Sequence, residues 1–305
     1  MLEICDRVTV IRDGCKVGTV EAGSLDEREL VRMILGHRLE DLYPEPQPVR
    51  GEVRLAVKGL SGPGVRDLSF ELHDGEVLGL TGLLGMGFDA VPYLMFGARP
   101  CEAGEVTLDG TTVRASALAP HAAKRLGLAL LPANRTRDSG LGLATVGENV
   151  TLTSLSSYFR GGRLRHRVES DFVERLLHEY EVNPPEPQRK LSTLSGGNQQ
   201  KALVAKWLHR DPRVLLLHEP TQGVDVGSRK QIFKLIRATA DRGCAVVIAS
   251  GEFEDLAHLC DRVLVFRHGR VVSDLRGASL TKERIVEQSY RRDSAVGAPA
   301  ESGTD

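Results

Sequence analysis

A serine followed by two glycines stands at the start of a helical pattern in residues 194–201, which read LSGGNQQK. The apolar residues that follow recur at the spacing of one helix face. Ser195 is therefore predicted as a helix N-cap, and Gly196 and Gly197 would let another surface approach the backbone closely. The first N–H groups of such a helix, together with its dipole, favour an anion. The segment predicts a phosphate-binding helix start, with a plain turn as the alternative.

A second group of polar residues follows an unbroken apolar run. Residues 214–217 read VLLL, and His218 and Glu219 come directly after them. An apolar run of this kind before turn residues predicts a parallel strand that is buried on both faces. Ligands of α/β sheets bind at the carboxyl ends of such strands. His218 and Glu219 are therefore candidate site residues at the edge of a sheet.

Three motifs, in this order and spacing, carry a family resemblance: LSGGNQQK, the Glu-Pro-Thr at residues 219–221, and the loop Gly223-Val224-Asp225. Over roughly residues 53–291 the chain resembles the nucleotide-binding subunit of an ABC transporter. It looks most like the C-terminal half of the tandem ATPases that drive bacterial monosaccharide importers.

The resemblance implies an α/β fold, the ABC-type P-loop NTPase domain. A mainly parallel core sheet would be flanked by helices, with an antiparallel β-subdomain over residues 53–115 and a helical subdomain around 147–205. It also implies ATP and Mg²⁺ as cofactors, with membrane permease subunits and a second ATPase domain or chain as partners. A periplasmic or extracellular sugar-binding protein would be an indirect partner. The protein would lie peripherally on the cytoplasmic face of the cell membrane.

The composition argues against several other classes of protein. The 305 residues carry a formal net charge of −1, which gives no electrostatic reason to expect a nucleic-acid partner. The five cysteines are dispersed without a C-x-x-C pair, which argues against a disulfide framework or a zinc site. No apolar run approaches the ~18–20 residues that span a bilayer. Membrane contact is therefore expected to occur through a partner.

An internal repeat divides the chain. Residues 5–14 read CDRVTVIRDG, and residues 260–269 read CDRVLVFRHG. Each copy predicts two strands joined by a tight turn and followed by a charged helix. Because the second copy closes a domain, the first should close one too. A coincidental pair of hairpins is the alternative.

This repeat leads to a division of the chain into four parts. We interpret residues 1–36 as the C-terminal remnant of a preceding ABC nucleotide-binding domain, 37–52 as a Pro-containing linker, 53–291 as an ABC nucleotide-binding domain, and 292–305 as a disordered tail.

Residues 82–89 read GLLGMGFD and lie between a predicted strand and a predicted helix. A phosphate-binding loop needs G-x-x-x-x-G-K-[ST], in which N–H groups cradle phosphates, the lysine reaches the β/γ oxygens and the hydroxyl holds Mg²⁺. Gly82 and Gly87 have this spacing, and Gly85 matches the family as well. Phe88 occupies the lysine position and Asp89 the Ser/Thr position, so the loop is degenerate.

The opposite side of this site also departs from the family. His218 stands where the family has the metal-supporting aspartate, whereas Glu219, which polarises the attacking water in the family, remains. Gly251 stands where active members have a histidine, and residues 131–134 read LPAN where the family senses Mg²⁺ through a Gln or an acidic residue.

The substitutions at positions 88, 89 and 218 change the net charge of the cleft by −1 with a neutral histidine. Two like charges at ~4 Å cost about 1 kcal/mol in water and roughly 4 kcal/mol at an effective dielectric near 20. In-line hydrolysis depends on positioned charge. We therefore expect that this half does not hydrolyse ATP alone, that any ATP binds weakly, and that Mg²⁺ is held only in the partner's site.

A specific contact follows from these substitutions. In the family, the hydroxyl of the phosphate loop and the aspartate at the strand end face the same metal. We therefore predict that Asp89 and His218 form a hydrogen-bonded pair in the space of the Mg²⁺, which would raise the pKa of His218. The alternative is that both side chains point to solvent.

The signature segment, residues 194–201, keeps the family's residues although the local lysine is missing. In the head-to-tail sandwich of the family, each signature serves the nucleotide of the opposite subunit. The resemblance therefore implies that Ser195, Gly196, Gly197, Asn198 and Gln199 complete a partner's site. The alternative is a non-hydrolytic interaction module, or a truncated gene remnant that retains the fold.

Three further residues match family patterns. Asp225 resembles the family's cross-interface aspartate, and a helix N-cap is the competing interpretation. Glu148 and Asn149 match a pattern near the surface that meets the membrane subunit, and a plain helix start is the competing interpretation.

Overall fold

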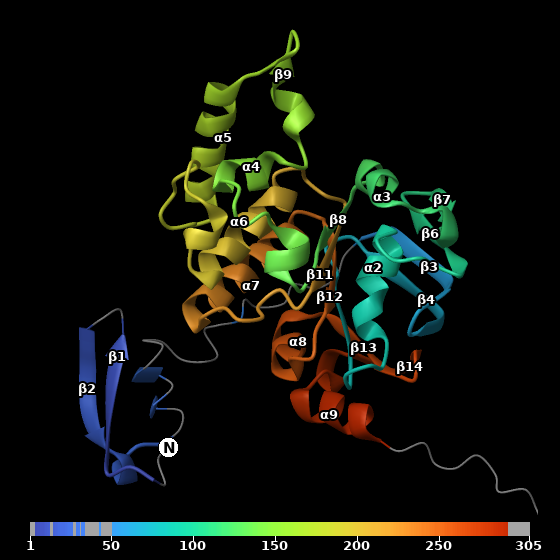
Figure 1. Ribbon diagram of the computed structural model, residues 1–305. Helices are drawn as coiled ribbons and strands as arrows, with labels where there is room; N and C mark the ends of the chain where they lie inside the picture. The colour runs from blue at the N-terminus through green and yellow to red at the C-terminus, as the bar shows by residue number, and fades with distance from the viewer. Residues whose placement is uncertain are drawn as a thin grey trace, which may run out of the picture.

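The computed structural model describes residues 4–12, 15–26, 29–30, 32–33, 43 and 51–291 (Figure 1). Most of the predicted linker, the end of the helix predicted after the first hairpin, and the predicted disordered tail lie outside these residues.

A six-stranded sheet with the order β14-β13-β5-β12-β11-β8 forms the centre of the fold. Its strands are β5 (Val77–Gly82), β8 (Leu128–Leu131), β11 (Val214–His218), β12 (Ala245–Ala249), β13 (Arg262–Arg267) and β14 (Arg270–Arg276). All neighbouring strands are parallel except the pair β13–β14. The mainly parallel core sheet is therefore confirmed. The apolar run at 214–217 is buried throughout, as predicted.

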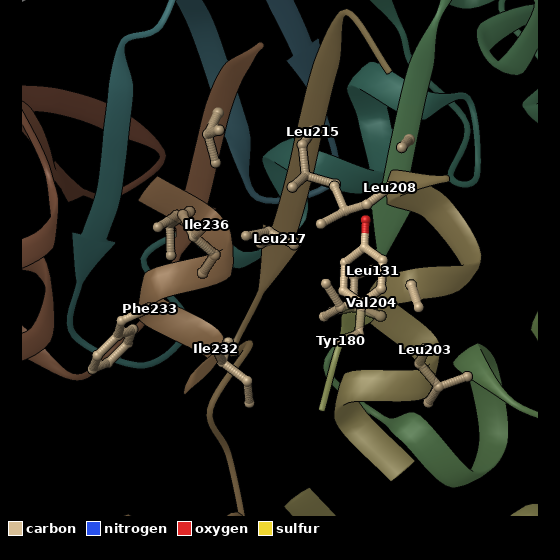
Figure 2. Close-up of a cluster of buried hydrophobic side chains, with 14 of the residues drawn as sticks. Leu131, Tyr180, Leu203, Val204, Leu208, Leu215, Leu217, Ile232, Phe233 and Ile236 are labelled. Carbon is tan, nitrogen blue, oxygen red and sulfur yellow. The ribbon is translucent and has the colours of Figure 1, made fainter. Parts of the chain in front are cut away.

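The alternation of side chains along the strands builds two hydrophobic clusters, one on each face of the sheet. On one face, Leu215 and Leu217 pack with the apolar side of α7 (Val226–Asp241), as Figure 2 shows. On the other face, Leu216 belongs to the cluster of α2 (Val91–Phe96). Each buried Leu side chain contributes about 1.5–3 kcal/mol. Both faces must be covered, which explains the continuous apolar runs.

A second, antiparallel sheet with the order β4-β3-β6-β7 packs into the α2 cluster. Its strands are β3 (Val53–Gly62), β4 (Val65–His73), β6 (Ala103–Leu108) and β7 (Thr111–Arg114). The predicted antiparallel β-subdomain at 53–115 is confirmed. The helix α3 (Pro120–Leu126) follows it and leads into β8.

The segment of the chain that connects β8 to β11 forms a helical region (Figure 1). It contains α4 (Val146–Thr151), α5 (His166–Glu179) and α6 (Gly196–Leu208). A two-stranded hairpin that the sequence analysis did not predict, β9 (Phe159–Arg160) and β10 (Arg163–Leu164), precedes α5. The chain closes with α8 (Phe253–Leu259) and, after β14, α9 (Lys282–Tyr290). No helix among the described residues is both long and apolar enough to cross a membrane.

The repeat in the sequence is also a repeat of backbone structure. The first copy folds as an antiparallel hairpin of β1 (Arg7–Arg12) and β2 (Cys15–Glu21), which correspond residue by residue to β13 and β14. Both hairpins shift register at the same place, between Val10 and Ile11 and between Val265 and Phe266. That residues 1–36 close a preceding domain stays a prediction.

Tyr43, in the middle of the predicted linker, is described and contacts the main domain. The hydroxyl of Tyr43 donates a hydrogen bond to Asp255 Oδ1 at 2.9 Å, and its ring stacks on His258 and Phe233. Asp255 also pairs with Arg229, near the start of α7. Tyr43 is therefore held by groups from both α7 and α8.

A buried ion pair joins α7 to the sheet. Arg237 on α7 donates to Asp261 at 3.0 and 2.6 Å, and both side chains are almost fully buried. Asp261 also accepts the backbone N–H of Val77, at the start of β5. Burial raises the pKa of Asp261 even beside this guanidinium. The charge of Asp261 therefore depends on Arg237.

Replacement of Arg237 by leucine should lower the free energy of unfolding by about 3–5 kcal/mol, because the Asp261 carboxylate would stay buried without its cation. Urea denaturation followed by circular dichroism measures the change. Arg284→Leu is the matched control, since Arg284 forms an exposed pair with Glu287 and should cost less than about 0.5 kcal/mol. Equal losses in the two variants would contradict the assigned role of the buried pair.

Candidate functional site

The signature segment, residues 194–201, forms the first turns of α6. Ser195 has extended backbone angles and is the N-cap, and its exposed hydroxyl accepts hydrogen bonds from the N–H of Asn198 at 3.5 Å and from its side-chain amide at 2.9 Å. The predicted cap is confirmed. Gln199 turns its side-chain amide back to the carbonyl of Leu194 at 2.9 Å. The N–H groups of Gly196 and Gly197 have no partner within the helix, and of these two residues Gly196 is partly exposed whereas Gly197 is buried.

The two glycines of the segment allow close packing, as predicted, but the surface that approaches them belongs to this chain. A Cβ on Gly197 would lie 2.0 Å from Ser228 Oγ, and one on Gly196 would lie 2.8 Å from Arg135 Nη2 and 2.9 Å from the carbonyl oxygen of Gly223. Larger residues at either position would push away the loop after β11 or the start of α7.

Two side chains hold this junction together. Residues Arg135–Ser139 form a π-helix of five residues. Its first residue, Arg135, donates to the carbonyl oxygens of Gln222 and Gly223 at 2.8 and 3.1 Å. Lys201, buried on α6, donates to Gln231 Oε1 on α7 at 2.9 Å and to the carbonyl of Glu181. Neither role is visible in the sequence, because each depends on partners that are distant along the chain.

Asp225 is the N-cap of α7, so its interpretation as a helix N-cap is confirmed. Its carboxylate accepts the N–H of Ser228 at 2.9 Å and the hydroxyl of Ser228 at 2.8 Å. Burial opposes ionisation of Asp225, but the hydrogen bonds from Ser228 outweigh it, and the pKa is lowered. The role of Asp225 across an interface between subunits stays a prediction.

The degenerate phosphate loop, residues 82–89, keeps its glycine-dependent conformation. Gly85 and Gly87 have φ of +81° and +97°. A Cβ on Gly87 would lie 1.8 Å from the carbonyl oxygen of Gly64 in the β3–β4 turn. The N–H of Gly269, in the β13–β14 turn, donates to the carbonyl of Met86 at 3.1 Å. Two turns therefore pack directly against the loop.

The two substituted positions of the loop have different environments. Phe88 is only 4% exposed and belongs to the same hydrophobic cluster as α2, so a buried ring replaces the lysine of the family. Asp89 is partly buried, and its carboxylate forms no hydrogen bond or ion pair with any residue in the described part of the chain. The loop therefore lacks a cation at the position that would neutralise phosphate.

The predicted pair of Asp89 and His218 is wrong. His218 Nδ1 instead forms a hydrogen bond of 3.0 Å with the hydroxyl of Tyr93 on α2, and the two rings meet edge to face. The Tyr93 oxygen also accepts the N–H of Ala133 at 3.3 Å, which leaves the hydroxyl proton for Nδ1. His218 is thereby held as a neutral acceptor.

The predicted rise in the pKa of His218 is wrong as well. Burial lowers the pKa of His218, and the nearby charge of Asp89 opposes this without reversing it. Burial wins because no carboxylate is hydrogen-bonded to the ring. The side chain is turned toward α2, where an uncharged hydroxyl is its partner.

Glu219 is held on both carboxylate oxygens. Oε2 accepts the hydroxyl of Ser250 at 2.7 Å, and Oε1 accepts the N–H of Gly251 at 2.7 Å. These donors come from the loop after β12, where the family's active members place a histidine. Glu219 itself has a φ of +47°, which is uncommon for a residue with a side chain. The sequence analysis named Gly251 but not this contact.

These residues do not fit a resident Mg²⁺. The cation prefers several oxygen ligands in octahedral geometry. Here Asp89 offers a free carboxylate, but the opposite position is a histidine bonded to Tyr93 and both oxygens of Glu219 accept hydrogen bonds. Among the described residues, no group of three or more His, Cys, Asp or Glu side chains could hold a metal ion. No hydrolytic step is therefore derived through a metal at this site.

The sequence pattern of the family described as ABC transporter matches residues 65–222. The chain belongs to the ABC transporter family. Its sequence is 38% identical, over 94% of its length, to a ribose/galactose/methyl galactoside import ATP-binding protein of Pseudomonas savastanoi, of which it covers 54%. It is also 38% identical, over 93% of its length, to the ribose import ATP-binding protein RbsA of Bacillus licheniformis, of which it covers 57%. The chain thus spans about half the length of these curated relatives.

Solved structures bear out the ABC fold. A nucleotide-free ATP-binding cassette from an ABC transporter superposes with a TM-score of 0.67 at 18% identity, over 79% of this chain and 100% of that one. An ATP-binding subunit of an ABC transporter gives a TM-score of 0.62 at 21% identity, over 77% and 99%. The ABC-type α/β fold expected from the resemblance is confirmed.

The buried state of His218 predicts a specific dependence of stability on pH. Burial lowers the pKa of His218 below 6.5, its value in the unfolded chain. The neutral ring therefore makes its full contribution to stability above pH 6.5, and this contribution is lost as the pH falls through the folded pKa. Between pH 7.5 and 5.5 the free energy of unfolding of His218→Gln should therefore fall less than that of the wild type.

Urea denaturation at several pH values measures this difference. His121→Gln, which removes an exposed histidine, is the control and should follow the wild type. His209 also has a pKa that burial lowers, so His209→Gln should act in the same direction as His218→Gln. Parallel curves for the wild type and His218→Gln would contradict the buried, neutral state of His218.

Proposed function

We propose that this chain is an ATP-binding subunit of an ABC importer for monosaccharides, with a degenerate site of its own and a signature segment that completes a partner's site. The named relatives, import ATP-binding proteins for ribose and related sugars at 38% identity, support the transport class. ATP hydrolysis in the partner's site would energise the uptake of sugar. The membrane permease and, indirectly, an external sugar-binding protein complete the proposed system at the cytoplasmic face of the membrane.

The observation that carries this proposal is the contrast between two sites of one domain. The start of α6 keeps an exposed N-cap at Ser195 and a helix start with free donors, suited to an anion brought by another chain. The chain's own phosphate loop has lost the lysine to the buried Phe88, and Glu219 is engaged on both oxygens. Phosphoryl transfer needs positioned positive charge, and that charge is missing here.

The partner in this proposal is a second ATPase domain or chain, which supplies the lysine and the Mg²⁺ site. Ser195 and the N–H groups of Gly196 and Gly197 would contact its γ-phosphate, while Asn198 and Gln199 hold the helix start in shape. Asp225 would lie beside them at the interface, since Gly197 packs against it. Alternatively, the chain is an interaction module or a gene remnant that takes no part in turnover.

The N-terminal hairpin supports a tandem arrangement. In β13, Phe266 is fully buried and pairs with β5. The equivalent residue of the first hairpin is Ile11, whose side chain is 67% exposed. An apolar side chain at this position is expected to pack against a neighbouring sheet. We propose that the body of a first ATPase domain provides that sheet.

The permease is proposed to bind at the helical region. A mostly apolar cavity of about 500 Å³ lies between α4 and α5. Leu141, which lines it, is 57% exposed, and Leu143, two residues further along the chain, is 86% exposed. Asn149 holds this loop through hydrogen bonds with Leu141 and Thr145, and Glu148 completes the capping box of α4. The pair predicted at the permease surface thus shapes an exposed apolar loop.

In the assembled transporter, Ser195→Arg should reduce the ATPase rate at least about tenfold, because the added side chain would block the approach of the partner's phosphate. Ser116→Arg, at an exposed serine in the β-subdomain, is the matched control and should keep wild-type activity. A colorimetric phosphate assay with and without the permease gives both rates. Turnover by this chain alone at the rate of the assembled transporter would overturn the proposal, and unchanged activity of Ser195→Arg would favour the interaction module.

Leu143→Asp should weaken binding of the permease at least about tenfold, because a charge would replace apolar contact area. The melting temperature should stay unchanged, since the side chain is exposed. Val271→Asp on β14 is the control and should bind normally. Co-purification with the permease in detergent provides the measurement. Wild-type binding by Leu143→Asp would place the permease surface elsewhere.

A further inference from the structure

A cavity of about 530 Å³ lies between α2, α6 and the turn Arg135–Ser139. Its volume is in the range of small-molecule sites. Tyr93 and His218 line it, but no residue of the phosphate loop 82–89 does. The cavity therefore lies beside the degenerate phosphate loop, and it shares His218 and residues 132–134 with the opposite side of the nucleotide site.

The walls of the cavity carry an excess of positive charge. Arg99, Arg137 and Lys206 line it, together with a single carboxylate, that of Asp138. Asp138 is bound by Arg137 through two hydrogen bonds of 2.8 and 2.9 Å. Within the described part of the chain, neither Arg99 nor Lys206 has a carboxylate within 4.0 Å. Neither cation thus has an ion-pair partner of its own, although the charge of Asp138 acts on the exposed Arg99.

Lys206 has the greater need of a counter-charge, because it is buried whereas Arg99 is exposed. It is only 8% exposed, and its ammonium has one hydrogen bond, to the carbonyl oxygen of Ser139 at 2.9 Å. Burial lowers the pKa of Lys206, and no neighbouring carboxylate opposes this. A buried ammonium without an anion is costly unless a ligand supplies the missing charge.

The remaining wall suits the organic part of a ligand. Tyr93, Phe96 and Trp207 contribute aromatic rings, and the guanidinium of Arg99 lies 4.6 Å from the centre of the Tyr93 ring. A phosphate monoester carries close to two negative charges near neutral pH and three acceptor oxygens. It therefore matches one lysine and one arginine better than a monocarboxylate does.

We propose that this cavity binds a small organic phosphate, with Lys206 and Arg99 as partners of the phosphate group and the aromatic wall as the partner of the organic part. The binding itself does not depend on the transport function. The segment 134–139 forms part of the wall, and its Arg135 holds the loop at Gln222 and Gly223 beside the signature segment. A ligand in the cavity would therefore bear on the geometry of the start of α6.

The chain offers a direct probe, because Trp207 is its single tryptophan and lines the cavity. Glucose 6-phosphate should change the fluorescence of Trp207 saturably with a Kd below ~1 mM, whereas glucose should not. Lys206→Met should weaken binding about tenfold or more, and Lys206→Arg should retain it. Isothermal titration calorimetry of the same proteins provides a readout that is independent of the tryptophan.

Two variants keep the test decisive. Arg99→Gln, at an exposed side chain that leaves the core intact, should also weaken binding about tenfold. Arg210→Gln is the matched control, because Arg210 lines a different cavity that also contains Trp207, and it should bind like the wild type. Absence of saturable binding up to ~10 mM, or equal affinity of the wild type and Arg99→Gln, would overturn the proposal.

Discussion

The close contact between the starts of α6 and α7 is the constraint on which the signature segment depends. Only a glycine fits at position 197, because a Cβ would meet Ser228 Oγ at 2.0 Å. The same hydroxyl is bound by Asp225, so one small space contains the cap of α7 and the second residue of α6. The exposed helix start is therefore held by the chain's own packing, before any nucleotide or partner is present.

The chain's own nucleotide site has been converted from a charged site into a packed one. Phe88 joins a hydrophobic cluster, and His218 accepts from a tyrosine instead of supporting a metal. Both carboxylate oxygens of Glu219 accept hydrogen bonds from donors in a single loop. These contacts stabilise the folded domain without requiring a ligand. The proposed loss of hydrolysis is compatible with a well-packed fold, because Phe88 and His218, which stand where the family has charged residues, both form contacts within the domain.

Local patterns in the sequence predicted the features that depend on residues close together in the chain, namely buried strands and helix caps. The buried strands follow from continuous apolar runs, and the caps Ser195 and Asp225 follow from residue type and position. The partner of His218 could not be predicted in this way, since Tyr93 is 125 residues away and reaches the ring only once α2 packs on the sheet. The roles of Arg135 and Lys201 were not predicted for the same reason, since their partners are also distant along the chain. Contacts between side chains from distant elements need the tertiary arrangement, even when the residues on one side are identified.

The turn Arg135–Ser139 lies where three parts of the domain meet. Arg135 faces Gly196 and the loop after β11, while Ser139 accepts the buried ammonium of Lys206. A single π-helical turn is rare and is often found at functional sites. The side chain of Arg135 and the carbonyl of Ser139 connect this turn to the loop after β11 and to α6. The five residues of this turn therefore join the surroundings of Lys206 to the signature segment through direct contacts.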